Sequence, residues 1–441
     1  MSRHARVLHL LCLVLAIALL ASCSGKKRAS PVPVAAPGEI ADLRNFPQDL
    51  NAYAKGSRKP LMTPATQASQ AARWQSRFFS PWHMSHPSVG KKEASTLLNA
   101  KARGWKDGHS RWTEEEWAGM RANADMASWP NACQPGITLR AANLREMPTA
   151  TPRFVHPTPD VRKDPFDYFQ YSLLPMGMPV YICHRSLDGR WLFVETPLVS
   201  GWMASADVAP VTPAFASQWE GTRLGCITKE RTSLLGESVG IGTVLPLPSQ
   251  GTVYMPVRGA DGTSAVRSAS CMDASPWPIV MTPASVAALG NQLLGQPYGW
   301  GGMLGLRDCS SLTRDLMTPY GIWLPRNSRP QARTGYPISL AGMSVPEKEA
   351  CIMRSAVPFA SLVGMNGHIM LYVGTCGNRP AILHDYWGVH VDEPADEDQR
   401  LVIGRVVVTS ITPGRELPHL HEGRTIGDRM HTVTILGNAV N

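Results

Sequence analysis

The spacing of apolar residues predicts a helical region at 39–130. Between residues 66 and 79, and again between 113 and 126, apolar side chains recur at intervals of three and four, the period of an amphipathic helix. Thr113 is followed three residues later by Glu116, the pattern of a capping box, so the second helix is expected to begin there. We interpret this region as an accessory helical layer on the domains that follow.

The pattern changes at residue 131 to short runs of β-branched and aromatic residues. Turn signals separate these runs, such as the Asp-Gly pairs at 188–189 and 261–262. Short strands of this kind, with tryptophans spaced along them, favour small closed barrels. Two such barrels are predicted in series, over 131–210 and 211–275.

From residue 276 onward the chain mixes helical and strand patterns. The stretch 282–294 has the period of a helix, with Thr282 placed as its N-cap. A glycine-rich loop then runs into a second helix at Cys309. Strands are predicted near 368–374, 380–384 and 401–408. Residues 276–441 are therefore predicted to form an α+β domain.

Cys309 is the candidate nucleophile. It stands where a loop enters a helix, so unpaired backbone N–H groups and the positive end of the helix dipole are expected to favour its thiolate, the nucleophilic form. The thiol pKa is therefore predicted to lie below the free-cysteine value of about 8.5. His368 and His384 follow in strand patterns, an order that suits a nucleophile, a base and a residue that orients the base. Alone, Cys309 would fit a buried structural thiol better; the three residues together favour an active site.

The N-terminus has the pattern of an export signal. Residues 1–22 have a basic start and an apolar stretch too short to span a bilayer. Small residues precede Cys23, which resembles the lipobox of bacterial lipoproteins, where the signal is cleaved before a cysteine that is then lipidated; an ordinary secretory signal is the alternative. Residues 23–38 would be the lipidated cysteine and a flexible tether. Since Ser24 permits outer-membrane sorting, we expect an exported protein, lipid-anchored in the periplasm on the outer membrane of a Gram-negative bacterium.

The composition limits the kinds of partner that the chain is expected to bind. With 44% hydrophobic and 17% charged residues the chain is globular, and its net charge of +9 would favour an anionic polymer such as cell wall or nucleic acid. No basic run is interleaved with aromatic residues, so nucleic acid is not expected. No metal or cofactor is expected either, because His83 and His86 lack a carboxylate or cysteine in register and the acidic run at 393–398 is interpreted as a solvated loop.

Six cysteines remain once Cys12, Cys23 and Cys309 are set aside. They fall two by two along the chain, and an exported protein can form disulfides. The spacing suggests the bridges 133–183, 226–271 and 351–376, although six cysteines allow many pairings. Buried free thiols are the alternative.

Five sequence features follow one another in the last domain. They are the segments 295–302, 308–311, 321–328 and 367–374, and His384. In this order they resemble the catalytic domain of the NlpC-type cell-wall cysteine peptidases, which are papain-like, over residues 282–408. The segments before it resemble two bacterial SH3-like domains and the N-terminal stabilising region of one multidomain branch. The resemblance implies a multidomain fold with a helical N-terminal region, two small SH3-like β-barrels and an α+β papain-like catalytic domain.

The resemblance also implies an activity. The branch contains γ-D-glutamyl-L-diamino acid endopeptidases, which cut peptidoglycan stem peptides between D-Glu and the diamino acid, here expected to be diaminopimelate. Several members require a free N-terminal L-Ala. By resemblance, Cys309 attacks the D-Glu carbonyl to form an acyl-enzyme, His368 transfers the proton, and His384, or alternatively Asp385, orients His368. An N-acetylmuramoyl-L-alanine amidase and a tethered murein-binding protein are the alternatives.

Substrate-binding residues follow from the same resemblance. Asp308 and Ser310 match positions that contact the amino-terminal part and backbone of the substrate. Asn327 and Ser328 stand where relatives carry Asp-Ser, so Asn327 removes a negative charge that would face a substrate amine. The first barrel closes that side of the cleft in this branch. A free amine needs an acidic or carbonyl-rich pocket, for which Asp167 and Tyr168 are the candidates, and Trp300 is a candidate for the cleft wall.

Overall fold

The computed structural model describes residues 39–392 and 400–437, and the elements from Ile40 onward belong to one unit. The predicted signal, Cys23 and the tether lie outside the described residues, as does the acidic run at 393–398. Among the described helices, none is both long enough and apolar enough to cross a membrane.

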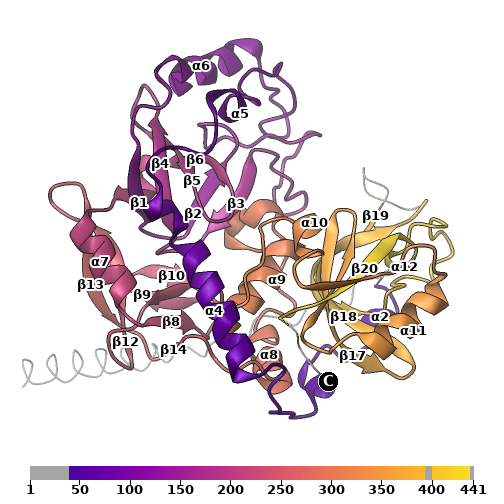
Figure 1. The fold of residues 1–441 in the computed structure, drawn as a ribbon. Helices are drawn as coiled ribbons and strands as arrows, with labels where there is room; N and C mark the ends of the chain where they lie inside the picture. The colour runs from indigo at the N-terminus through magenta and orange to yellow at the C-terminus, as the bar shows by residue number, and fades with distance from the viewer. Residues whose placement is uncertain (1–38, 393–399, 438–441) are drawn as a thin grey trace, which may run out of the picture. The chain divides into compact units, whose positions relative to one another are not determined.

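The N-terminal region is helical, as predicted. Its helices are α2 (Asp42–Asn45), α3 (Asn51–Ala54), α4 (Pro64–Phe78), α5 (Lys91–Ala94) and α6 (Glu114–Ala124), with 3-10 turns η2 (Ser80–His83) and η3 (Met126–Ser128). The predicted capping box is present: Glu116 N–H donates to Thr113 Oγ1 at 3.2 Å, and Thr113 N–H donates to Glu116 Oε2 at 3.0 Å. In α4, the Trp74 ring lies 4.5 Å from that of Phe78 and 4.8 Å from that of Trp277, centroid to centroid. Helix α4 therefore packs against the later part of the chain (Figure 1).

The first predicted barrel is a seven-stranded antiparallel sheet. Its strands are β1 (Gln134–Thr138), β2 (Ala142–Arg145), β3 (Gln170–Leu174), β4 (Pro179–Arg185), β5 (Trp191–Glu195), β6 (Ser200–Ala204) and β7 (Val208–Pro210). They pair in the order β3-β2-β6-β5-β4-β1-β7, around a core that includes Leu144, Val180 and Val194. A long loop, residues 146–169, joins β2 to β3 and was not foreseen from the sequence. Residues of this loop and of β3 line the cavity at Cys309 that is described below.

The second β region is divided among three small sheets. Its strands are β8 (Leu224–Ile227), β9 (Thr232–Leu234), β10 (Glu237–Val239), β11 (Val244–Pro246), β12 (Thr252–Arg258), β13 (Ser264–Ser270) and β14 (Ala274–Pro276). They pair as β11-β8-β14, β10-β9 and β12-β13. Helix α7 (Pro213–Gly221) precedes them and was not predicted, although Thr212 accepts a capping hydrogen bond from Phe215 N–H and Pro213 begins the first turn.

The last domain is α+β, as predicted (Figure 1). Its helical elements are α8 (Pro283–Gly290), η5 (Trp300–Gly305), α9 (Cys309–Met317), η6 (Thr318–Tyr320), α10 (Ser328–Gln331), α11 (Val345–Ser355) and α12 (Ile426–Arg429). Its strands are β15 (Tyr336–Ser339), β16 (Ser361–Met365), β17 (His368–Cys376), β18 (Arg379–His390), β19 (Arg400–Thr409) and β20 (Met430–Ile435). They form one antiparallel sheet in the order β15-β20-β16-β17-β18-β19. Leu312 and Leu316 of α9 share a core with Ile369 and Leu371 of β17, which holds the helix against the sheet.

The seven cysteines among the described residues are free, so the three suggested disulfides are wrong. Most of these thiols are buried as core side chains, which is common for cysteine. Cys183 donates a hydrogen bond to Glu195 Oε1 at 3.4 Å, and Cys226 donates to the Ser275 carbonyl at 3.8 Å. Cysteines that lie close together in the sequence therefore do not form disulfide bonds with one another.

Candidate active site

Cys309 is the first residue of α9, and Asp308 caps the helix. Asp308 has an extended backbone, and its Oδ1 atom accepts hydrogen bonds from the N–H groups of Ser310 and Ser311 at 3.1 and 2.9 Å. The Cys309 side chain is 7% exposed, and it lines a cavity of about 240 Å³. A local capping motif thus sets the position of the candidate nucleophile.

His368 begins the strand that packs against α9. Asn366 and Gly367 form a two-residue turn between β16 and β17, with Gly367 at a φ of +81° that favours glycine. The backbone N–H of Ile369, the next residue, hydrogen-bonds the Cys309 sulfur. The start of β17 therefore lies directly against the thiol.

A hydrogen-bond chain runs from His368 through His384 to Thr409. His368 Nε2 lies 2.9 Å from His384 Nδ1, and His384 Nε2 lies 3.0 Å from Thr409 Oγ1. Because the Thr409 hydroxyl donates its only proton to the Ser410 carbonyl at 2.7 Å, it accepts from His384 Nε2–H. His384 Nδ1 then accepts from His368 Nε2–H. This arrangement leaves His368 Nδ1 as the basic nitrogen.

Asp385, the alternative partner for His368, makes no comparable contact. Neither of its carboxyl oxygens has a hydrogen-bond partner among the described residues. Burial, together with the nearby Asp308 carboxylate, raises the pKa of Asp385 well above its usual value. Of the two candidates, His384 is the one whose geometry orients His368.

Arg326 joins the Cys309 loop to the first barrel. Its guanidinium, 4% exposed, donates to both oxygens of Asp308 at 3.2 and 2.6 Å. It also donates to Ser172 Oγ at 2.9 Å and to the Tyr171 carbonyl at 3.0 Å, both on β3. Burial opposes ionisation of Asp308, but Arg326 and the capping hydrogen bonds lower its pKa to about 2. Sequence reasoning did not single out Arg326, although it lies inside the matching segment 321–328.

The cavity at Cys309 brings together most of the predicted substrate-contact residues. Its predicted lining residues are Asp308, Ser310, Asn327, Ser328, Trp300 and Tyr168. Asn327 Nδ2 donates to the Tyr171 hydroxyl at 3.4 Å, and the rings of Tyr168 and Trp300 lie 5.8 Å apart. The first barrel adds Glu146, just after β2, which sequence reasoning missed. A carboxylate therefore does reach the cavity from the barrel side, but from an unexpected position.

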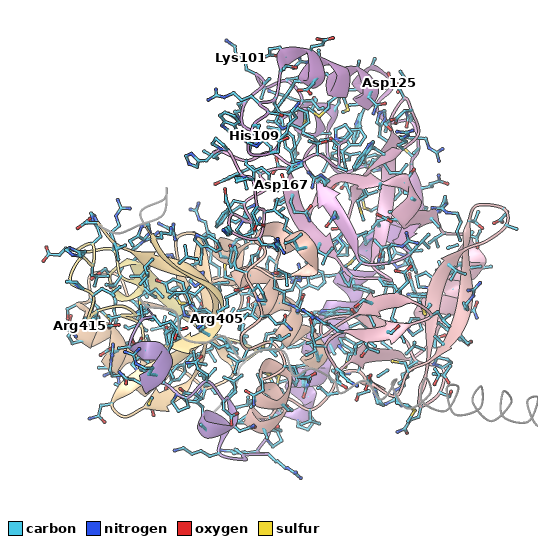
Figure 2. All side chains as sticks on the ribbon, turned by 180° about the vertical axis from the view of Figure 1, so that it is seen from behind. Lys101, His109, Asp125, Asp167, Arg405 and Arg415 are labelled. Carbon is cyan, nitrogen blue, oxygen red and sulfur yellow. The ribbon has the colours of Figure 1, made fainter. Side chains whose placement is uncertain are left out.

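Asp167 does not line this cavity, which corrects the prediction for it. Figure 2 labels Asp167 near the strands of the first barrel. Its side chain is 1% exposed and accepts from Arg145 Nη2 at 2.9 Å and from the backbone N–H groups of Arg153 and Phe169, each at 2.8 Å. These contacts hold the loop between β2 and β3 in place. The adjacent Tyr168 points to the cavity instead, so the sequence identified the segment but not which of its neighbouring side chains faces the cleft.

Family models match three stretches of the chain. The NlpC/P60 family matches residues 295–397, the NLPC_P60 stabilising domain matches 11–129, and an SH3 domain of the SH3b1 type matches 152–204. Cys309, His368 and His384 all lie within the first of these. The chain belongs to the NlpC/P60 family.

One curated relative and one solved structure are similar to this NlpC/P60 protein. The gamma-D-glutamyl-L-lysine dipeptidyl-peptidase of Bacillus cereus is 30% identical over 142 residues, which make up 31% of this chain and 40% of that relative. The match thus spans less than half of the relative's length. An NlpC/P60 endopeptidase from Photobacterium damselae subsp. piscicida superposes with a TM-score of 0.78 at 22% identity, covering 92% of this chain and 100% of that one. The two share a fold along nearly the whole chain.

In this NlpC/P60 domain, Cys309 and His368 are both neutral at neutral pH. Burial, with the Asp308 carboxylate adding to it, raises the pKa of the Cys309 thiol to about 12. Burial, with Arg429 and Arg400 adding to it, lowers the pKa of His368 to about 3. The predicted lowering of the thiol pKa is therefore wrong, because burial and a neighbouring carboxylate outweigh the helix N-terminus.

We expect the pH dependence of alkylation to reveal this neutral pair. Below a raised thiol pKa the thiolate fraction rises with pH, so inactivation by iodoacetamide should accelerate about tenfold per unit between pH 7 and 9. Because the pKa of His368 is lowered, kcat/KM should not decline in acid until well below pH 6.5. Mass spectrometry would follow labelling, with Cys309→Ala as the control for the other thiols. A labelling rate that stays constant from pH 5 to 9 would show a preformed thiolate and contradict the expectation.

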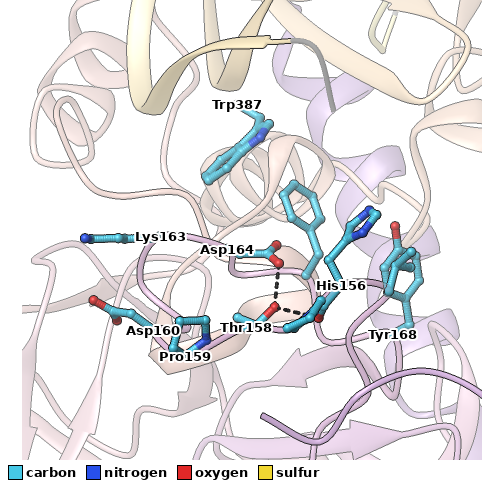
Figure 3. A pocket seen from close by; sticks show the side chains of 11 residues that line it. His156, Thr158, Pro159, Asp160, Lys163, Asp164, Tyr168 and Trp387 are labelled. Carbon is cyan, nitrogen blue, oxygen red and sulfur yellow. Dashed lines mark hydrogen bonds between the residues drawn. The ribbon is translucent and has the colours of Figure 1, made fainter. Parts of the chain in front are cut away.

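Two further cavities adjoin the one at Cys309. A cavity of about 350 Å³ contains His368 and shares Tyr168 and Trp300 with the Cys309 cavity. A third, of about 270 Å³, is bounded by the loop between β2 and β3 and by Trp387 (Figure 3). It shares Phe166, Tyr168 and Trp387 with the second. The NlpC/P60 domain and the first barrel thus line a series of adjoining cavities that continues beyond Cys309 and His368.

Proposed function

We propose that this protein is a cysteine endopeptidase that hydrolyses the γ-D-glutamyl–diaminopimelate bond of peptidoglycan stem peptides. The observation that carries the proposal is the hydrogen-bonded His368–His384–Thr409 chain at the strand that contacts the Cys309 sulfur. Membership of the NlpC/P60 family supports a cell-wall substrate, and the name of the Bacillus cereus relative supports a γ-D-glutamyl bond.

The site geometry supports acyl transfer through a thioester. Cys309 Sγ attacks the γ-carbonyl of D-Glu while His368 Nδ1 takes the thiol proton. His368 then returns that proton to the departing amine of the diamino acid as the C–N bond breaks. Water, activated by the same nitrogen, hydrolyses the thioester and regenerates the thiol. His384 keeps the His368 ring in the required tautomer throughout.

The start of α9 supplies a place for the oxyanion. The Asp308 carboxylate takes up the N–H groups of Ser310 and Ser311, but not that of Cys309. The Cys309 N–H can therefore donate to the tetrahedral oxyanion. One such donor contributes about 10²–10³ in rate.

A free N-terminal L-Ala fits the barrel side of the Cys309 cavity. The Asp308 carboxylate is occupied by Arg326, and Asn327 has no charge, so neither would compensate a substrate ammonium. Glu146 is an exposed carboxylate in the same cavity. We therefore assign ammonium binding to Glu146, which would replace the charge that Asn327 lacks.

The deciding assay offers L-Ala-γ-D-Glu-meso-diaminopimelate and its N-acetylated form to the wild type and to Cys309→Ala. Wild type alone should release L-Ala-D-Glu, with kcat/KM at least about tenfold higher for the free amine, as expected for a charged hydrogen bond. Glu146→Gln should reduce that preference and retain activity on the acetylated form. Intact muropeptides, offered in parallel, identify an amidase if only the bond from muramic acid to L-Ala is cut. No cleavage of any substrate would leave the murein-binding alternative.

Export and lipid anchoring form part of the proposal. The pattern of residues 1–22 and the small residues before Cys23 support lipidation of Cys23 and a periplasmic location on the outer membrane. Peptidoglycan is then within reach of the tethered enzyme. Labelled palmitate should be incorporated into the wild type and not into Cys23→Ser; equal incorporation would remove the anchor from the proposal.

A further inference from the structure

Three arginines gather in the cavity that contains His368. Arg400 is the first residue of β19, Arg424 lies just before α12, and Arg429 is the last residue of α12. His390, at the end of β18, lines the same space and lies 3.4 Å from Arg429 through Nε2 and Nη1. Elements separated in the sequence thus bring several cationic groups to one side of the reacting histidine.

Among the described residues that line this cavity, arginines outnumber carboxyl groups. Asp385 is the one carboxyl among the described lining residues, and burial together with the Asp308 carboxylate raises its pKa well above the usual value. Burial, together with Arg400 and Arg424, lowers the pKa of Arg429. Burial and the same arginine cluster lower the pKa of His390 to about 4. Burial is the largest cause of both pKa shifts and the neighbouring arginines add to it, and a bound anion would offset the repulsion among these cations.

The arginines lie where the leaving group would be. In the proposed reaction the acyl part, with its L-Ala ammonium, occupies the cavity of Cys309 and Glu146. The departing amine receives its proton from His368, so the residue that carries this amine extends into the cavity on the His368 side. Tyr168 and Trp300 line both cavities and mark the boundary between the two parts of the substrate.

We infer that Arg424 and Arg429, with Arg400, bind a carboxylate of the leaving diamino acid. The inference rests on the proposed function and extends it to the primed side of the scissile bond. Diaminopimelate carries a carboxylate at the end of its side chain, where lysine has only an ammonium that the cluster would repel. The terminal carboxylate of a tripeptide is a second source of the same chemistry. Arginine suits either one, because its planar fork can pair with both carboxylate oxygens.

A substrate panel separates the two carboxylates. It contains L-Ala-γ-D-Glu followed by meso-diaminopimelate, by meso-diaminopimelate amidated at its α-carboxyl, by L-Lys, and by L-Lys amide. The enzymes are the wild type, Arg424→Gln, Arg429→Gln and, as a matched exposed control on the same domain, Arg415→Gln. Arg415 lies outside the cavity and should leave every rate unchanged.

We expect each cavity variant to lower kcat/KM for the diaminopimelate tripeptide about ten- to a hundredfold, mainly through KM, as for loss of a charged hydrogen bond. The Lys amide substrate should change less than about twofold. A loss that persists with amidated diaminopimelate assigns the cluster to the side-chain carboxylate, and a loss that appears with L-Lys but not its amide assigns it to the terminal one. Equal losses on all four substrates, or none on any, would overturn the inference. Failure of the wild type to cut any of them would instead refute the proposed function.

Discussion

Replacing His368 with glutamine is expected to lower kcat by about 10³–10⁴, the upper part of the range for a general acid–base. The effect should be large because the raised pKa of Cys309 leaves almost no thiolate at pH 7 without a base beside it. KM should change little, since in the proposed mechanism His368 acts on the thiol proton and on the leaving amine rather than holding the ground-state substrate. Steady-state kinetics on L-Ala-γ-D-Glu-meso-diaminopimelate at pH 7 would measure both parameters.

Two comparisons make this prediction specific. The double variant Cys309→Ala/His368→Gln should be no slower than Cys309→Ala, because residues that act as a unit are not additive. At the positioning residue, His384→Asn retains an acceptor for His368 Nε2–H, whereas His384→Leu does not. The Asn variant should therefore keep more activity and a nearly wild-type pH profile. Equal activity of the two His384 variants would contradict the hydrogen-bond chain.

Replacing Arg326 with methionine is expected to destabilise the protein by about 3–5 kcal/mol, because Asp308 would remain buried and charged without its partner. The guanidinium also makes the contacts to Ser172 and Tyr171 that join the Cys309 loop to the first barrel. Activity should fall with stability, since that loop carries the proposed nucleophile. Urea unfolding followed by tryptophan fluorescence would give the free energy.

The double variant Asp308→Asn/Arg326→Met is the matched control. It removes the buried Asp308 charge that has lost its partner, and it should recover part of the lost stability. The stability of the wild type should also depend on pH because of this ion pair. Because the folded pKa of Asp308 is lowered to about 2, the stabilisation is present above about pH 4 and is lost as the pH falls toward 2. A loss below about 1 kcal/mol in Arg326→Met would show that the ion pair is dispensable.

Much of the fold followed from patterns within short stretches of sequence. The capping box at Thr113, the helix start at Thr282 and the strands around His368 and His384 were all predicted near their observed positions. Helix α7 was missed because a short helix between strands has too few turns to show a period. Asp167 was misassigned because neighbouring residues face opposite sides, and packing decides which one faces the cleft.

The sequence by itself determined the order of the domains, the loop–helix junction at Cys309 and the two histidines that follow, because each depends on residues close together in the chain or on motifs in series. Only the tertiary structure decided what surrounds them. The site also contains Glu146, Arg326 and the arginine cluster, which come from separate elements. No local sequence pattern therefore predicts that they lie there. The tertiary structure also decides the direction of the thiol pKa shift. The sequence shows that Cys309 lies at a helix N-terminus, which would lower the pKa. The burial and the charges that outweigh this effect arise only when the sheet and the first barrel pack around Cys309.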